Sequence, residues 1–372
     1  MVMVELSTAA VTLALASNFF LGKEGILEGA CDRLEPYLLS QMVGQDMAIQ
    51  QFSDAVCDHL NQPHPQKPLV VSAHGSPGVG KSYMHKLAAR ALYNQKPQLE
   101  LECPGIDCPS LKVFSGLDYV SIDRAQQHAA LKTALLEHLR KMPQALIVID
   151  EYDKMDCDTQ FMFKQLIQGS HNVDVSMNRA IVVLESNAGF EDLHQLLVKT
   201  RDRSKINAEE VQRLLKDIVW KRWDEGGCHD HASLWKMVGL VDFFLPFLPL
   251  EQVHLERLFQ IRLGAIAASL LHSHRVNLTW APELIPFLYK KVDFDGPYPI
   301  EGAKEASVLL TRYVSRTLRQ WTTSHAQPQQ GWLTLGGGLI PKALKKPQPP
   351  EHHLGLFVKG QGLVIRKNLK PP

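Results

Sequence analysis

The stretch His74–Tyr83, HGSPGVGKSY, contains the residue types that bind the phosphates of a nucleotide. Glycines allow backbone N–H groups to close around phosphates without Cβ clashes. Lys81 can neutralise the charge of the outer phosphates, and the Ser82 hydroxyl can ligate magnesium. The apolar run PLVVSA precedes the stretch, which favours a P-loop over a glycine-rich turn without a ligand. The sequence predicts that ATP and Mg²⁺ bind at eight consecutive residues: Gly75, Ser76, Pro77, Gly78, Val79, Gly80, Lys81 and Ser82.

Two further polar sites follow apolar runs. Asp150 ends the run ALIVID, and Glu151 follows it. We expect Asp150 to hold the magnesium ion and Glu151 to activate a water molecule. Asn187 follows the run RAIVVLES and could orient that water near the γ-phosphate. The alternatives are an ordinary acidic strand end and an Asn-Ala-Gly turn, but both fit less well next to a P-loop.

Predicted strands and helices alternate along residues 69–187, the part of the chain that carries these polar residues. Short Val/Ile/Leu runs at 69–73, 145–150 and 179–186 predict strands. Helices are predicted between them at 81–94, 125–141 and 157–168. Such runs indicate an α/β fold with a parallel sheet covered by helices on both faces. Further helices are predicted at 206–222, 250–272, 282–291 and 304–321. No strands are predicted between the last three of these helices.

This order of P-loop, acidic pair, polar residue and helices resembles the AAA+ ATPases. Several stretches resemble more narrowly the torsins, Clp-related AAA+ ATPases of the endoplasmic reticulum lumen and nuclear envelope. The resemblance covers about residues 25–320 and implies a P-loop AAA+ parallel sheet with a small C-terminal helical lid domain. The stretches that carry it are VGQDMA (43–48), PQKPLVVSAHG (65–75), DEYDKM (150–155), SNAG (186–189) and VDFFLPFLPLEQVHL (241–255).

The resemblance also assigns roles near the lid. It implies that Asn187 is the sensor 1 residue and that Lys304, in Gly302-Ala303-Lys304, is the sensor 2 lysine. Torsins have Gly-Cys-Lys at this place, so the missing cysteine puts thiol-based redox sensing in doubt. The alternative for Lys304 is a solvated residue at the start of a helix.

A second implication concerns an arginine that acts on a neighbour's ATP. Clp unfoldases carry it just before the strand that precedes the lid, where this chain reads GLVD (239–242). Torsins share the gap, and membrane-anchored luminal partners supply the arginine in trans. The absence therefore predicts a slow enzyme that needs a protein activator. Arg201 and Arg203 are the alternative source of this arginine within the chain. Tyr119 is a candidate for a loop that grips polypeptides, and the alternative is that it is a tyrosine of the core.

Four parts are expected along the chain. Residues 1–24 form a signal peptide or a buried N-terminal hydrophobic segment. Residues 25–248 form the large nucleotide-binding domain, and residues 249–324 form the helical lid. Residues 325–372 form a flexible, basic, Pro/Gly-rich tail, either solvated or in weak contact with anionic lipid or nucleic acid.

Bulk composition excludes several classes of protein. The net charge is +1 over 372 residues, so no global field attracts nucleic acid, and no specific nucleic-acid partner is expected. The six cysteines do not make a disulfide scaffold in a chain this long, and the pairing of Cys103 with Cys108 stays open. The crowded Cys228, His229 and His231 fit a solvated loop better than a zinc site.

The functional prediction is an ATPase that remodels a protein client, in the way of a chaperone, as a homo- or hetero-oligomer. The resemblance places it in the endoplasmic reticulum lumen or nuclear envelope, with membrane association possible through a partner. The alternatives are a self-sufficient Clp-like unfoldase and an ATP-bound scaffold that hydrolyses little.

Overall fold

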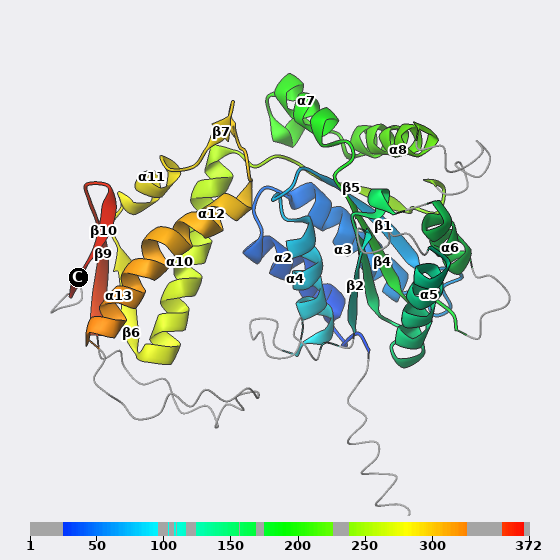
Figure 1. The fold of residues 1–372 in the computed structure, drawn as a ribbon, viewed down its shortest axis with the longest axis horizontal. Coiled ribbons are helices and arrows are strands. Elements are labelled where there is room, and N and C mark those ends of the chain that lie inside the picture. The colour runs from blue at the N-terminus through cyan, green and yellow to red at the C-terminus, as the bar shows by residue number, and fades with distance from the viewer. Residues whose placement is uncertain are drawn as a thin grey trace, which may run out of the picture. The chain divides into compact units, whose positions relative to one another are not determined.

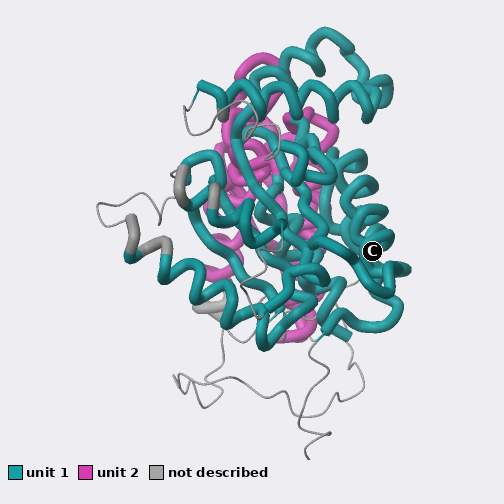
Figure 2. Tube along the Cα trace, turned by 90° about the vertical axis from the view of Figure 1, so that its right-hand side faces the viewer, with its two compact units in different colours: residues 1–76, 80–248 teal, residues 77–79, 249–372 magenta. Residues whose placement is uncertain are grey.

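The computed structural model describes residues 25–95, 103, 108, 110–116, 124–155, 157–168, 175–225, 238–325 and 352–367. The chain divides into two compact units, coloured separately in Figure 2. The first comprises Met1–Ser76 and Gly80–Leu248, and the second comprises Pro77–Val79 and Pro249–Pro372. Within the described residues, no helix is both long enough and apolar enough to cross a membrane.

A five-stranded sheet is the centre of the first unit. Its spatial order is β2-β3-β4-β1-β5, and every neighbouring pair is parallel. The inner strands are almost continuous runs of buried Val, Ile and Leu, as expected for strands covered on both faces. The predicted α/β fold is therefore confirmed. The strands are β1 (Leu69–Gly75), β2 (Leu111–Ser115), β3 (Leu146–Asp150), β4 (Ile181–Ser186) and β5 (Phe243–Phe247).

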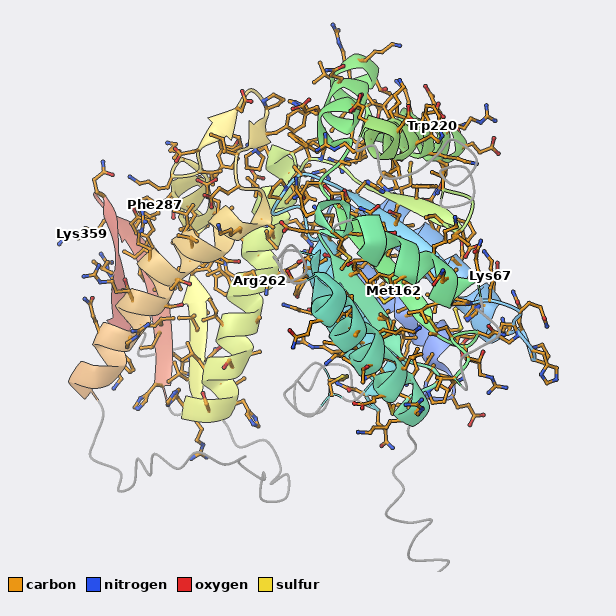
Figure 3. The ribbon with its side chains drawn as sticks, turned by 45° about the vertical axis from the view of Figure 1, so that its right-hand side comes forward. Lys67, Met162, Trp220, Arg262, Phe287 and Lys359 are labelled. Carbon is orange, nitrogen blue, oxygen red and sulfur yellow. A yellow bond between two sulfur atoms is a disulfide. The ribbon has the colours of Figure 1, made fainter. Side chains whose placement is uncertain are left out.

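Helices cover both faces of this sheet (Figure 1). Helix α2 packs against both α3 and α4 on one side, and α5 and α6 lie on the other side. Met162 of α6, labelled in Figure 3, is buried there. The helices of this unit are α2 (Ala30–Gln41), α3 (Asp46–Leu60), α4 (Lys81–Tyr93), α5 (Arg124–Lys141), α6 (Cys157–Ile167), α7 (Phe190–Thr200) and α8 (Ala208–Glu225), with short 3-10 turns η2 (Tyr152–Lys154) and η3 (Arg203–Lys205).

Strands β2 and β5 have weak sequence signals for a physical reason. Both lie at the edges of the sheet. In β2 the polar Lys112 interrupts a run of five residues, and β5 contains Pro246, which is tolerated in edge strands. Inner strands need long apolar runs, whereas edge strands do not, so a search for apolar runs finds the centre of the sheet first.

The second unit mixes helices with short strands. Phe287 of α11, labelled in Figure 3, packs edge-on against Tyr313, with ring centroids 5.4 Å apart. The elements are α10 (Gln252–His274), β6 (Val276–Trp280), α11 (Leu284–Tyr289), β7 (Phe294–Asp295), β8 (Tyr298–Pro299), α12 (Ala303–Leu309), the π-helical turn η4 (Leu310–Ser315), α13 (Arg316–His325), β9 (His352–Lys359) and β10 (Gly362–Lys367).

Two expectations about this unit are wrong. Strands β6, β7 and β8 lie between helices that were expected to follow one another directly. The expected flexible tail, 325–372, is wrong for residues 352–367, which form the hairpin β9–β10 and extend a sheet in the order β10-β9-β6. The average Pro and Gly content of the tail concealed two short apolar runs joined by a turn at Gly360, whose φ is 59°. Leu354 and Leu356 of β9 are buried.

Candidate functional site

The loop between β1 and α4 is built by glycines. Gly75 ends β1, and a Cβ atom there would collide with the backbone oxygen of Phe247. Gly78 and Gly80 have φ angles of 78° and 111°, in the region that favours glycine. Helix α4 begins at Lys81, so its unpaired N–H groups and positive dipole end face the loop. The backbone thus forms a site suited to an anion.

Lys81 connects this loop to the end of β4. Its ammonium group donates to the carbonyl oxygens of Gly75 at 2.7 Å and Ser76 at 3.0 Å, and to Oδ1 of Asn187 at 2.9 Å. Burial lowers the pKa of Lys81 to about 8, although the nearby carboxylates of Glu185 and Asp150 oppose the shift. The structure therefore brings the P-loop lysine and the predicted sensor amide together.

The acidic pair lies at the matching end of the neighbouring strand. Asp150 ends β3, and its pKa is raised by burial and by the negative charges of Glu185 and Glu151. Glu151 has a φ of 53°, which is uncommon for a residue with a side chain. Backbone strain of this kind concentrates at functional sites. Because β3 and β4 are parallel neighbours, Asp150 and Glu151 lie at the same edge of the sheet as Asn187.

Ser82, Glu185 and His85 form a buried hydrogen-bonded group beside this pair. The Ser82 hydroxyl donates to Oε2 of Glu185 at 2.7 Å, and Nδ1 of His85 lies 2.6 Å from Oε1 of the same carboxylate. The side chains of Glu185 and His85 are 0% and 2% exposed. Burial alone would raise the pKa of Glu185, but the hydrogen bonds from His85 and Ser82 and the charge of Lys81 lower it overall.

Glu185 and His85 were not among the predicted site residues, although the sequence contains a signal for each. Glu185 is an acid directly after the apolar residues IVVL of a predicted strand, where a buried carboxylate needs partners. His85 lies one turn after Lys81 and Ser82 on the predicted helix, so it shares a face with them.

These residues fit a nucleotide with magnesium. The loop supplies N–H groups and an ammonium for phosphates, and Lys81 already binds three oxygen atoms in a place suited to phosphate oxygens. Ser82 and Asp150 offer the hard oxygen ligands that Mg²⁺ prefers, and Mg²⁺ bound with a nucleotide needs only one or two protein carboxylates. When bound, the ion would supply charge neutralisation for phosphoryl transfer.

A buried histidine supports the strand end that carries Asn187. His74, the residue before Gly75, is 1% exposed. Its Nε2 lies 2.7 Å from the Ser72 hydroxyl, and its Nδ1 lies 3.1 Å from the carbonyl of Ala188, which follows Asn187. Burial lowers the pKa of His74 to about 4, although the bond to Ala188 opposes the shift. His74 is thus neutral at neutral pH and links β1 to the loop after β4.

The remaining predicted residues fall in several places. Pro77, Gly78 and Val79 are grouped with the second unit, where the N–H of Ala303 donates to the Gly78 oxygen at 2.8 Å. Lys304 is in the same unit, on α12, with a 70% exposed side chain that lies 3.6 Å from the carboxylate of Glu301. Its sensor role stays a prediction.

The other candidates divide between described and undescribed parts of the chain. Arg201 caps the C-terminus of α7 and is exposed, whereas Arg203 donates to the carbonyl of Gly44. Outside the described residues lie Tyr119, the segment 1–24, and the group Cys228, His229 and His231.

Two disulfides are present among the described cysteines. One joins Cys31 of α2 to Cys57 of α3, with Cα atoms 5.5 Å apart, and the other joins Cys103 to Cys108, with Cα atoms 4.8 Å apart. The sequence alone left the second pairing open and did not indicate the first. Disulfides of this kind persist in oxidising compartments such as the secretory pathway.

Comparison with known proteins agrees with this geometry. The torsin family model matches residues 23–102, and the model of the ATPase family associated with various cellular activities (AAA) matches residues 71–209. A torsin-like protein of Drosophila melanogaster is 25% identical over 239 residues, which cover 62% of this chain and 67% of that protein.

The chain is also similar to the chaperone protein ClpB of two bacteria. The ClpB of Chlamydia caviae is 26% identical over 277 residues, which cover 71% of this chain, and that of Chlamydia muridarum is 24% identical over 303 residues, which cover 78%. The matched parts span only 30% and 32% of those two proteins. The P-loop geometry and these matches together make the chain similar to the torsin-family AAA ATPases.

Proposed function

We propose that this chain binds ATP with Mg²⁺, hydrolyses it, and uses the cycle to remodel a protein partner. The observation that carries the proposal is the position of Lys81, held between two P-loop carbonyls and the amide of Asn187. One cation thus contacts both the phosphate loop and the strand end from which the amide would orient a water molecule. A glycine-rich turn without a ligand gives no reason to bury an ammonium group there.

Each residue has a distinct task in this proposal. The loop residues and Lys81 bind the phosphates, and Ser82 and Asp150 hold Mg²⁺. Glu151 accepts a proton from the attacking water, and Asn187 orients that water. The left-handed backbone conformation of Glu151 fixes the position of its Cβ atom at the end of β3, next to Asp150. Lys304 would contact the γ-phosphate as sensor 2.

The protein-level role is proposed from the similarity to torsins. This chain has no arginine at residues 239–242, and the torsins that it resembles share this gap. We propose that a protein activator supplies it in trans, and that the chain works in an oligomer on a protein client. The disulfides and the family support a site of action in the lumen of the secretory pathway, and we propose the endoplasmic reticulum or nuclear envelope.

The direct test is Glu151→Gln, which keeps the size of the side chain and removes the base. We expect the variant to bind ATP as the wild type does and to retain it unhydrolysed, which nucleotide analysis of the isolated protein measures. Glu209→Gln is the matched control, because Glu209 is an exposed acid on α8, and it should hydrolyse at the wild-type rate. Turnover by Glu151→Gln equal to that of the wild type would overturn the assigned chemistry.

A further inference from the structure

Glu185 is a charged residue where an apolar one would suit the fold. It sits on β4, opposite Ala73 of β1, and its side chain is 0% exposed. The four residues before it, IVVL, are all buried and apolar. Burying a carboxylate costs several kcal/mol unless hydrogen bonds compensate it. Ser82 and His85 provide such bonds, so the chain maintains a costly group at this position.

The two oxygens of this carboxylate have different partners. Oε1 faces Nδ1 of His85, and Oε2 accepts the hydroxyl proton of Ser82. An ionised carboxylate only accepts hydrogen bonds, so the proton of the His85 contact is on Nδ1. The opposite ring nitrogen of His85 is buried and has no hydrogen-bond partner among the described residues. The imidazole thus serves to fix the orientation of Glu185.

The bond from Ser82 determines where the hydroxyl lone pairs point. A hydroxyl has one proton and two lone pairs, and once its proton is donated to Glu185 the lone pairs face away from that carboxylate. A metal ion needs a lone pair, not the proton. Outer-shell groups that orient a ligand in this way commonly contribute 10- to 100-fold to metal affinity, as an order of magnitude.

We propose that Glu185, held by His85, is a positioning residue that orients the Ser82 hydroxyl for Mg²⁺ and thereby sets the magnesium requirement of nucleotide binding. The inference rests on the proposed function, because it needs Mg²⁺–ATP in the P-loop. It goes further by adding two residues, on β4 and on α4, that no P-loop pattern contains. Glu185 need not touch the ion or the nucleotide in this role.

The test measures binding, not turnover. A fluorescent ATP analogue is titrated onto the full-length protein at a series of free Mg²⁺ concentrations, which gives the Mg²⁺ concentration for half-maximal affinity. We expect Glu185→Gln to raise this midpoint about 10-fold. Glu185→Leu, which suits the apolar strand, should raise it at least as much and serves if the Gln variant does not fold. His85→Gln should raise it by a smaller factor.

Ser82→Ala separates positioning from a purely structural role. If Glu185 acts through the Ser82 hydroxyl, Glu185→Gln should not raise the midpoint further in a Ser82→Ala protein. The matched control is Tyr93→Phe, which removes a hydroxyl hydrogen bond (2.8 Å to the carbonyl of Gln144) at the other end of the same helix. This control should leave the midpoint unchanged even where it lowers the melting temperature.

The outcomes distinguish the two proposals. A wild-type protein that fails to bind the analogue with Mg²⁺ would overturn the proposed function and this inference with it. A wild-type protein that binds, together with Glu185 variants that keep its Mg²⁺ midpoint, would overturn this inference alone. An equal shift in the presence and absence of the Ser82 hydroxyl would also overturn it, because Glu185 would then act on Mg²⁺ by another route.

Discussion

The lowered pKa of Lys81 predicts that ATP binding weakens as the pH rises through about 8. The free protein buries this ammonium at 8% exposure, and burial lowers its pKa to about 8. Phosphates favour the charged form, so the pKa must rise when ATP binds. Well below pH 8 Lys81 is charged with or without ATP. Above it, the protein must take up a proton in order to bind, and that proton costs affinity.

The size of the effect follows from the titration curve of one group. At a pH equal to the pKa, about half a proton is taken up for each ATP bound, and affinity is about twofold below its low-pH value. One unit higher, about nine tenths of a proton is taken up and affinity is about tenfold lower. One unit below the pKa, only about a tenth of a proton is taken up and the loss of affinity is negligible.

Isothermal titration calorimetry measures both quantities. Titrations at each pH in two buffers with different heats of ionisation give the number of protons taken up, and the same curves give the affinity. Lys81→Arg is the control, because a guanidinium stays charged throughout this range. Its pH profile reports every other group, the nucleotide included, and should show no proton uptake centred near pH 8.

Two results would contradict this prediction for Lys81. Wild-type protein that takes up no proton at pH 8 and 9 would show that burial does not lower the pKa of Lys81. Proton uptake of the same size in Lys81→Arg would show that a different group titrates.

Three further predictions concern stability, each measured by urea unfolding of the full-length chain. Gln45→Ala should lower the free energy of unfolding by about 2–4 kcal/mol, because the buried N–H and carbonyl groups of Leu248 both lose the Gln45 side-chain amide as their hydrogen-bond partner. The control Gln50→Ala, at an exposed residue, should change this free energy little. Replacing both Cys31 and Cys57 with serine opens a loop of 26 residues and should cost about 3 kcal/mol, and a reducing agent should then have no further effect through this bond. The pKa of His74 is about 4 in the folded protein, so between about pH 6.5 and 4 the unfolded chain binds more protons than the folded one. The free energy of unfolding should therefore decrease by about 2 kcal/mol when the pH is lowered from 7 to 5. His74→Gln should make this decrease smaller.

The sequence determined the centre of the fold more clearly than its edges. Strands β1, β3 and β4 are predictable because burial on both faces demands uninterrupted apolar runs. Strand β2 and Pro246 of β5 lie at the sheet edges, where that demand is relaxed. The hairpin β9–β10 pairs with β6, more than 70 residues earlier in the chain, and no local pattern specifies such a pairing.

The site shows the same division. Lys81, Asp150 and Asn187 belong to patterns whose spacing and context are informative, so they could be named from the sequence. Glu185 and His85 belong to none, since their meaning depends on a contact between β4 and α4 that is made 100 residues apart. The bond between Lys81 and Asn187, across 106 residues, likewise became visible only in the structure.

The site is proposed to bind and turn over Mg²⁺–ATP. Steady-state ATP hydrolysis by the purified full-length chain tests it most directly, over a range of protein concentrations, with Lys81→Ala as the blank and ATP binding measured in parallel. We expect ATP binding that Lys81→Ala abolishes, with slow turnover that an added arginine-bearing partner accelerates. Wild-type protein that binds no more ATP than Lys81→Ala would contradict it, and fast turnover that grows with concentration would contradict the need for an activator.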